Sequence, residues 1–134
     1  MIKTDILIIG AGPIGLFTVF EAGLLKLRCH LIDALPYAGG QCAEIYPKKP
    51  IYDIPAYPEI LAGDLIQNLE QQIAPFEPTY TLGERAETIE KLSDGNFIVT
   101  TNKGTEHSAA AVIIAGGLGS FEPRKPPIEG ISDY

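Results

Sequence analysis

The sequence contains few of the side chains from which proteins build metal sites. Its 134 residues include two cysteines, Cys29 and Cys42, and two histidines, His30 and His107. The cysteines are 13 residues apart and form no CxxC pair, and the histidines have no spacing typical of metal ligands. We therefore expect the protein to bind no metal.

Positive charge and long apolar runs are also scarce. Lys and Arg together number 10 against 17 Asp and Glu, which gives a formal net charge of −7. This balance argues against a nucleic-acid-binding protein, which needs a basic face. No apolar run approaches the roughly 18 residues of a membrane-spanning helix. The first run begins at Ile6 and leads directly into glycines, so it indicates a strand and not a signal peptide. We expect a cytoplasmic protein without nucleic-acid or membrane partners.

What the sequence does contain is a glycine-rich turn in the context of a dinucleotide-binding unit. An apolar run, Ile6–Ile9, precedes the G-x-G-x-x-G turn, and a helix-like segment, 16–25, follows it. The turn consists of Gly10, Ala11, Gly12, Pro13, Ile14 and Gly15. The first glycine permits the tight turn, the second lets the backbone approach a pyrophosphate, and the third lets helix and strand pack closely. The first helical amides and the positive end of the helix dipole would then face the phosphates.

An acidic residue stands where such units hold a ribose. Asp33 closes a second apolar run, 29–32, and lies 23 residues after Gly10. At this spacing we expect its carboxylate to accept hydrogen bonds from the ribose hydroxyls. Because the carboxylate would repel a 2′-phosphate, it favours FAD or NAD over NADP at this site.

The remaining pattern predicts one α/β domain, for which the length suffices. The predicted strands are 5–9, 28–32, 80–82, 85–91, 96–101, 105–107 and 111–115, and the predicted helices are 14–25 and 59–74. The strands between 80 and 107 would form a β-meander. The fully apolar run 111–115 fits a buried strand that returns parallel beside the first.

Residues 34–58 form an unusual segment between the predicted elements. They contain five prolines and four of the six tyrosines of the chain. The prolines argue against regular structure, and the tyrosines argue against disorder. We therefore expect an ordered loop without helices or strands that lines a ligand site.

Together these features resemble the FAD-binding part of the pyridine-nucleotide disulfide oxidoreductase superfamily. The segments GGQCAEIYPKKPIYDIPAYP (39–58) and VIIAGGLGSFEPR (112–124) resemble one branch closely, the ferredoxin–NADP reductases of the thioredoxin-reductase-like type. The resemblance implies a three-layer Rossmann-like FAD-binding fold with a parallel sheet and a β-meander. It implies FAD as cofactor, NADPH as hydride donor in the full-length protein, and ferredoxin or a similar one-electron carrier as partner.

The resemblance covers only the first part of such an enzyme. It implies that residues 1–120 are the N-terminal portion of the FAD-binding domain, and that 121–134 lead as a linker toward an NADPH-binding domain that this chain lacks. We therefore expect a fragment that cannot transfer hydride from NADPH alone. Relatives are often dimers, so a homodimer is also compatible with the resemblance.

The resemblance assigns cofactor-binding positions but no catalytic side chain. The positions are Gly10, Gly12, Pro13, Ile14 and Gly15 at the pyrophosphate, Asp33 at the ribose, Gln41 and Tyr46 at the flavin, Ala86 at the adenine, and Phe121 after the last glycine turn. Packing roles remain the alternative for Gln41, Tyr46 and Phe121. A redox disulfide of the glutathione-reductase type is excluded, because Pro47 stands where the partner of Cys42 would be.

Three other functions stay open. The chain could be part of another flavoenzyme of the superfamily, such as a thioredoxin reductase or a monooxygenase. It could be a non-catalytic module that only binds FAD or a partner. An NAD-dependent dehydrogenase is the third alternative, against which the GGQ loop and the meander argue.

Overall fold

The computed structural model describes residues 1–119, which form one α/β domain. In chain order its elements are β1 (Ile2–Ile9), α1 (Pro13–Leu24), β2 (Cys29–Asp33), α2 (Gly40–Glu44), β3 (Pro50–Ile51), β4 (Ile60–Leu61), α3 (Ala62–Ile73), the 3₁₀ turn η1 (Ala74–Phe76), β5 (Thr79–Leu82), β6 (Ala86–Lys91), β7 (Phe97–Thr101) and β8 (Glu106–Ile114). Within these residues no helix is long and apolar enough to cross a membrane.

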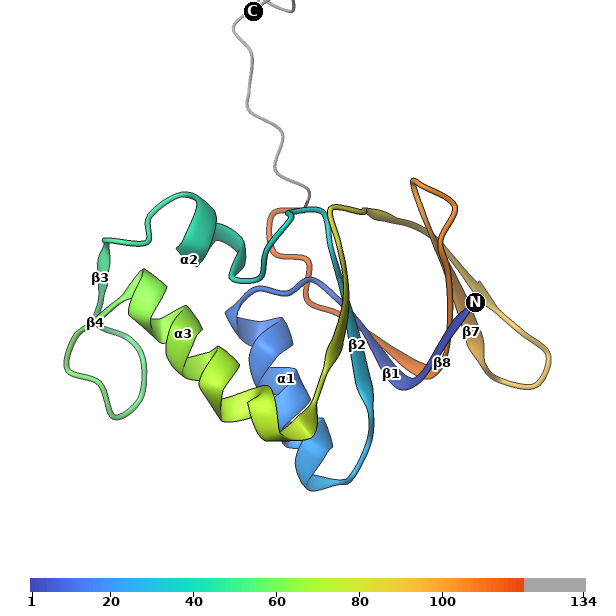
Figure 1. Cartoon of the computed structure of the whole chain (residues 1–134), viewed down its shortest axis with the longest axis horizontal. Helices are drawn as coiled ribbons and strands as arrows, with labels where there is room; N and C mark the ends of the chain where they lie inside the picture. Colours follow the sequence, from blue (N-terminus) through green and yellow to red (C-terminus); the bar gives the residue numbers. More distant parts are fainter. Residues whose placement is uncertain (120–134) are drawn as a thin grey trace, which may run out of the picture.

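Six strands form one sheet in the order β5-β2-β1-β8-β7-β6. The pairs β5–β2, β2–β1 and β1–β8 are parallel, whereas β8–β7 and β7–β6 are antiparallel. The sheet therefore has a parallel half, as βαβ crossovers require, and a meander half. Figure 1 shows helices α1 and α3 side by side on one side of the parallel strands, with the meander on the other side. This arrangement confirms the predicted fold class.

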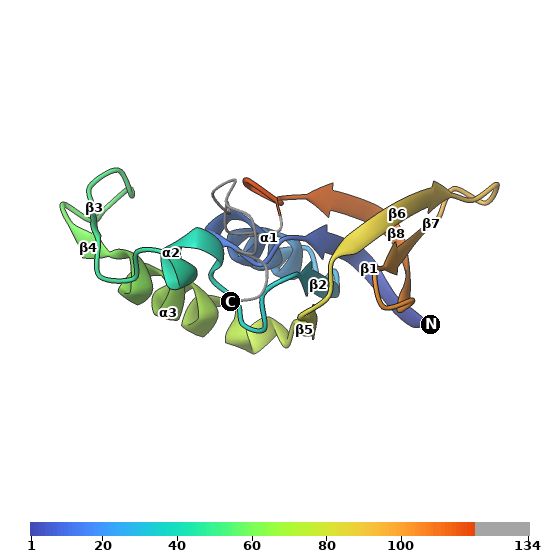
Figure 2. The same cartoon turned by 90° about the horizontal axis from the view of Figure 1, so that it is seen from above.

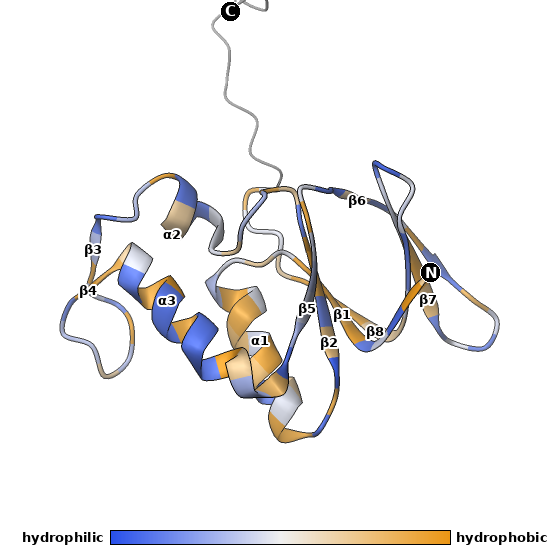
Figure 3. Cartoon of the chain, viewed as in Figure 1, coloured by the Kyte–Doolittle hydropathy of each residue, from blue (hydrophilic) through white to orange (hydrophobic). Residues whose placement is uncertain are grey.

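Two apolar clusters hold these layers together. The larger lies between the helices and the parallel strands and includes Ile8, Leu16, Leu31, Leu65 and Ile73. The smaller joins Leu7 and Ile32 of the parallel strands to Val99 and Ala109 of the meander. The hydropathy colouring shows the difference between the two helices: α1 is apolar along most of its length, whereas α3 alternates between apolar and polar residues (Figure 3). Helix α3 is thus a typical one-sided surface helix.

Strand β8 joins the two halves of the sheet. Along its whole length it pairs with β1, from Ile2↔His107 to Ile9↔Ile114, but β7 pairs only with its first half, up to Ala109. The two strands predicted at 105–107 and 111–115 are therefore one strand. Its parallel position beside β1 is as predicted, but its burial is not: Ile114 is 71% exposed. In this second half Val112 is partly buried against the smaller cluster, whereas Ala111 and Ile113 are exposed.

Other boundaries also differ from the predictions. Residues 34–58 are not free of regular structure, because they contain α2 and β3, and β3 pairs with β4 just before α3. Helix α3 therefore begins at Ala62, three residues after the start of the predicted helix 59–74. The predicted strand 80–82 is real, but as β5 it extends the parallel half beyond β2 and takes no part in the meander. Figure 2 shows how far the β3–β4 end and the β6–β7 end of the molecule lie apart.

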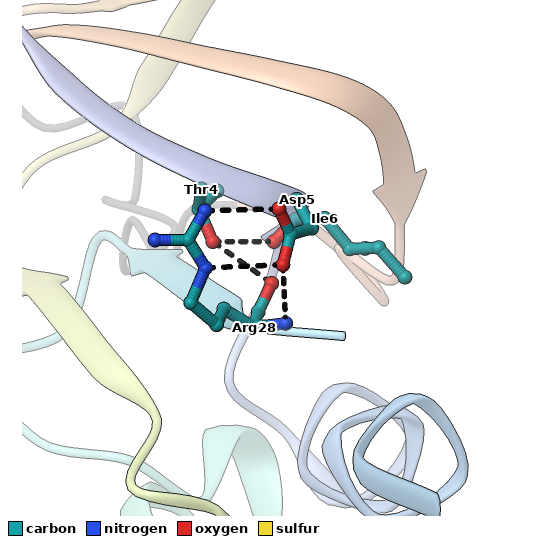
Figure 4. A network of polar contacts seen from close by, with 4 residues as sticks. All are labelled: Thr4, Asp5, Ile6 and Arg28. Carbon is teal, nitrogen blue, oxygen red and sulfur yellow. Dashed lines mark hydrogen bonds and ion pairs between the residues drawn. The ribbon is translucent and has the colours of Figure 1, made fainter. Parts of the chain in front are cut away.

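An exposed ion pair fixes the start of β2 against β1. Arg28 directs its guanidinium nitrogens to both carboxylate oxygens of Asp5, at 3.0 and 3.1 Å, and its backbone N–H donates to the same carboxylate at 2.8 Å. The hydroxyl of Thr4 donates to the carbonyl of Arg28 at 2.9 Å. These contacts join the two strands at the end opposite the glycine turn (Figure 4).

Candidate functional site

A cavity opens at the carboxyl ends of the parallel strands. Its volume is about 640 Å³, within the range of small-molecule and cofactor sites. Open parallel sheets place their ligands at this edge. The lining residues come from the glycine turn, the end of β2, α2, the start of the meander and the loop after β8: Gly10, Gly12, Pro13, Ile14, Asp33, Gln41, Cys42, Glu44, Tyr46, Glu84, Arg85, Ala86 and 115–119.

Two glycines of the turn are required by close contacts. Gly10 has φ +108°, and a Cβ there would lie 2.2 Å from the carbonyl oxygen of Ala115. A Cβ at Gly15 would lie 1.9 Å from the carbonyl oxygen of Gly10. Gly12 differs, because no atom lies within 4 Å of its ideal Cβ. The space beside Gly12 is part of the cavity, so this glycine leaves its backbone accessible from the cavity side.

Helix α1 begins at the cavity. Gly12 is its N-cap, Pro13 occupies the first turn, and the N–H of Leu16 closes the first helical hydrogen bond to Gly12 at 2.9 Å. The amides before Leu16 have no partner within the helix. The first turn carries no acidic side chain, so the partial positive charge of the helix end is not neutralised there. The geometry suits an anion such as a pyrophosphate.

Asp33 lies at the end of β2, on the cavity wall. One carboxylate oxygen accepts the N–H of Ala11 at 2.7 Å, and the other accepts the N–H of Leu35 at 2.9 Å. Each carboxylate oxygen has a second lone pair. The side chain therefore orders the glycine turn and still has acceptor capacity toward the cavity.

The short helix α2 packs directly on the glycine turn. The N–H of Gly39 donates to the carbonyl of Ala11 at 2.8 Å, which brings Gln41 and Tyr46 to the cavity wall. The Tyr46 hydroxyl lies 3.4 Å from the Gln41 side-chain oxygen, and the Lys49 ammonium lies over the Tyr46 ring at 5.2 Å from its centroid. A cation over the face of a ring is attractive, and the Tyr46 ring also packs against the larger apolar cluster.

The thiol of Cys42 is held in its neutral form. The residue is 8% exposed, and burial raises the pKa of its thiol, while a hydrogen bond from Tyr46 opposes the shift. Burial, followed by interaction with Cys42, likewise raises the pKa of the Tyr46 hydroxyl. Because the thiolate is the reactive form, Cys42 acts here as a small packing residue.

The start of the meander closes the far wall. Residues Glu84, Arg85 and Ala86 line it in sequence. The carboxylate of Glu84 accepts the hydroxyl of Thr101 at 2.6 Å, and this bond, followed by one with Thr105, lowers the pKa of Glu84. Of these three residues, only Ala86 was predicted from the sequence to contact a cofactor. The neighbouring polar pair could have been found from its position next to Ala86 at the start of a strand.

The structure brings together most of the residues that the sequence assigned to a cofactor. Eight of them line one cavity: Gly10, Gly12, Pro13, Ile14, Asp33, Gln41, Tyr46 and Ala86. Gly15 does not line it and lies instead at the helix–turn contact. Phe121 lies outside the described residues, as do all of 121–134. The assignments to particular parts of a cofactor stay predictions.

Solved structures with the same fold include thioredoxin reductases and cyclohexanone monooxygenases. A thioredoxin reductase from Streptococcus pyogenes superposes with a TM-score of 0.74 at 24% identity, covering 94% of this chain and 38% of the other. A cyclohexanone monooxygenase from Rhodococcus sp. Phi1 gives a TM-score of 0.72 at 22% identity, covering 96% of this chain and 29% of the other. At these identities the likeness concerns the fold alone. The chain is thus a Rossmann-like α/β domain of the kind found in thioredoxin reductases.

Sequence relatives are far closer. Ferredoxin–NADP reductase 2 of Christiangramia forsetii is 80% identical over all 134 residues, and ferredoxin–NADP reductase of Flavobacterium johnsoniae is 72% identical over the same length. The chain spans 38% of the length of each. No protein-family model matches the chain. Over its whole length the chain is homologous to ferredoxin–NADP reductases, which confirms the resemblance found in its motifs.

Proposed function

We propose that the chain is the FAD-binding part of an NADPH-dependent flavoprotein reductase that passes electrons to ferredoxin. The observation that carries the proposal is a cavity at the carboxyl edge of the sheet, in which the glycine turn, the Asp33 carboxylate and the α2 segment converge. Homology to proteins named ferredoxin–NADP reductase supports the identity of the donor and the acceptor.

The residues present fit a flavin dinucleotide. A pyrophosphate needs backbone amides at a helix N-terminus without a blocking Cβ, and Gly12 leaves that space open. A ribose needs a carboxylate with free lone pairs, which Asp33 offers. A flat ring system needs an aromatic face and an amide nearby, which Tyr46 and Gln41 offer.

Each group then has a definite task. The first turn of α1 would hold the phosphates, Asp33 would hold the ribose, and the backbone at Ala86 would meet the adenine. Tyr46 and Gln41 would orient the ring, and Cys42 would pack behind them as a neutral thiol. FAD, when bound, supplies the hydride and single-electron chemistry, and the protein supplies its binding and orientation.

The finer parts of the proposal concern the whole protein. Because the chain spans 38% of the length of its relatives, we assign NADPH binding to the remaining length of the full protein. We further infer a cytoplasmic location and ferredoxin or a similar one-electron carrier as acceptor, and a homodimer stays a prediction. NADPH oxidation by the full-length protein, measured with and without ferredoxin, tests this electron path.

Flavin binding can be tested on the chain itself. Purified wild type and Gly12→Ala are titrated into FAD while the flavin fluorescence is recorded. They are then desalted, and the visible absorption spectrum is taken. We expect wild type to perturb the flavin and Gly12→Ala to bind it at least ten-fold more weakly, because the added methyl group fills the space that the pyrophosphate needs.

Gly12→Ala is a sharp test because the fold tolerates it. No atom lies within 4 Å of the new Cβ, and the backbone of Gly12, at φ −73°, suits alanine. Circular dichroism and the urea midpoint should therefore match those of wild type. A full-length protein that leaves the flavin unperturbed, or a Gly12→Ala variant that binds as tightly as wild type, would overturn the assignment.

A further inference from the structure

Two buried histidines on different strands share one threonine hydroxyl on the inner face of the curled sheet. His30 of β2 and His107 of β8 are 2% and 0% exposed. Thr81 Oγ1 of β5 lies 2.8 Å from His30 Nε2 and 2.9 Å from His107 Nε2. The chain of contacts ends at Thr79 Oγ1, 2.7 Å from His30 Nδ1.

These side-chain contacts connect strands that are not hydrogen-bonded neighbours in the sheet. Strands β5 and β8 are three places apart in the order β5-β2-β1-β8, which in a flat sheet is a distance of about 14 Å. The bond between Thr81 and His107 therefore exists because the sheet curls, and it holds that curl from the inside. We call His30, Thr81 and His107, with Thr79, the histidine clamp.

The hydrogen bonds that the clamp can form depend on how many protons the two imidazoles carry. Thr81 has one hydroxyl proton, so it can donate to one imidazole and accept from the other. With both rings neutral, or with one of them protonated, all three contacts can be hydrogen bonds. With both rings protonated, Thr81 Oγ1 can still accept both Nε2–H groups with its two lone pairs, but its own proton then has no acceptor among the two rings. The ring centroids are 5.0 Å apart, so two buried positive charges would also repel each other.

Burial outweighs the groups that favour a charged His107. The backbone at Val99, the Glu84 carboxylate and the backbone at Thr105 favour its protonated form, whereas burial, which has the largest effect, and the amino terminus of the chain oppose it. His107 Nδ1 is buried without a hydrogen-bond partner in the described part of the chain. Burial and the neighbouring His107 lower the pKa of His30 to about 4, and burial lowers the pKa of His107.

We propose that the histidine clamp is an acid-released device that holds the meander against the parallel strands when both imidazoles are neutral and opens when both take up a proton. Opening separates β8 from β5 and frees the adjoining stretch, 84–86, which forms the far wall of the cavity. The domain thus carries a pH response in its fold, at a place distinct from the cavity itself.

The protein's histidine count makes the test direct. The chain has two histidines, so both imidazole signals can be followed by NMR as the pH is lowered from 8 to 4. We expect neither ring to titrate near the ordinary value of about 6.5 while the chain is folded. Below about pH 5, amides of β7 and β8 should lose protection from exchange earlier than those of α1. A ring that titrates normally in the folded chain would overturn the proposal.

A second measurement counts the protons. Urea unfolding at pH 5 to 6 gives the dependence of the unfolding constant on pH, which reports the protons gained when the whole chain, and with it the clamp, unfolds. For wild type this dependence should approach 100-fold per pH unit, corresponding to two protons. In His30→Gln or His107→Gln, where one ring remains, it should approach ten-fold, whatever the absolute stability of the variant.

The matched control removes a nearby carboxylate. Glu84→Gln keeps an acceptor for Thr101 but cannot titrate, and its effect on acid stability in wild type belongs below pH 4.5 because its folded pKa is lowered. The dependence in this variant should stay near 100-fold per pH unit. A ten-fold dependence in wild type, or one that both histidine variants leave unchanged, would contradict the clamp.

Discussion

The carboxylate of Asp33 accepts the backbone N–H of Ala11 at 2.7 Å, which ties the end of β2 to the glycine turn after β1. The residue that the sequence assigned to ribose binding therefore also orders the turn that would receive the phosphates. Its second oxygen bonds the N–H of Leu35 at 2.9 Å. The Asp33 side chain therefore holds both the glycine turn and the segment after β2 in place without a ligand.

Asp33→Asn should accordingly weaken both the fold and the site. The amide keeps one acceptor oxygen but turns an N–H₂ group toward the other backbone N–H. We expect the free energy of unfolding to fall by about 1–3 kcal/mol, the cost of a lost bond to a charged group, and FAD affinity to fall as well. Urea unfolding and FAD titration measure the two effects.

Glu44→Gln is the matched control for this substitution. Glu44 lines the same cavity but lies on the exposed end of α2. It should stay within about 0.5 kcal/mol of wild type, as is usual for surface changes. Equal effects of the two substitutions would show that the hydrogen bonds of Asp33 have no special role.

The second and third glycines of the turn, Gly12 and Gly15, predict opposite outcomes on alanine substitution. A Cβ at Gly15 would lie 1.9 Å from the carbonyl oxygen of Gly10, whereas a Cβ at Gly12 meets nothing within 4 Å. Gly15→Ala should therefore destabilise the chain by about 1–3 kcal/mol or more through overpacking. Gly12→Ala should leave the thermal midpoint unchanged. A thermal melt of both variants checks this, and equal midpoints would mean that helix α1 shifts freely away from the turn.

Local patterns predicted the parts of the fold that local physics decides. The glycine turn, the strand before it and the acid at Asp33 are specified by backbone geometry and periodicity over about 30 residues. The structure accordingly places eight of the ten assigned residues around one cavity. The amphipathic helix α3 could also be predicted from the sequence, because its apolar positions recur at the helical period.

Long-range pairing could not be predicted in this way. Strand β8 is continuous because β1 pairs with it from Ile2 to Ile9, and this register depends on residues more than 100 positions apart. The burial of 111–115 was wrong for the same reason: an apolar run does not reveal whether a neighbour covers it. The histidine clamp was also invisible, since His30 and His107 meet only through the curl of the sheet.

Both thiols should resist alkylation in the native chain. Cys29 and Cys42 are buried, and burial raises the pKa of Cys29 to about 11 and that of Cys42 in the same direction. Because the thiolate is the nucleophile, iodoacetamide at pH 7.5 should modify neither within minutes, whereas both should react in 6 M guanidinium, a concentration well above the usual unfolding range of roughly 2–5 M. Mass spectrometry counts the adducts. Rapid native modification of Cys42 would show a reactive thiol at the cavity.

Two groups of Arg28, its guanidinium and its backbone N–H, lower the pKa of Asp5, and substitution of Arg28 can separate their contributions. The guanidinium and the backbone N–H of Arg28 both bond the carboxylate and lower the pKa of Asp5 from 3.8 to about 2. The stability this lowering provides is present above about pH 4 and is lost as the pH falls through about 2.

Arg28→Ala removes the guanidinium but keeps the backbone donor. We therefore expect the pKa of Asp5 to rise to between about 2 and 3.8, with Arg28→Lys intermediate because it keeps the charge but not the two-point contact. A carbon-detected NMR titration of the carboxyl group measures it. A value unchanged in Arg28→Ala would assign the whole shift to the backbone N–H, and a full return to 3.8 would assign it to the guanidinium.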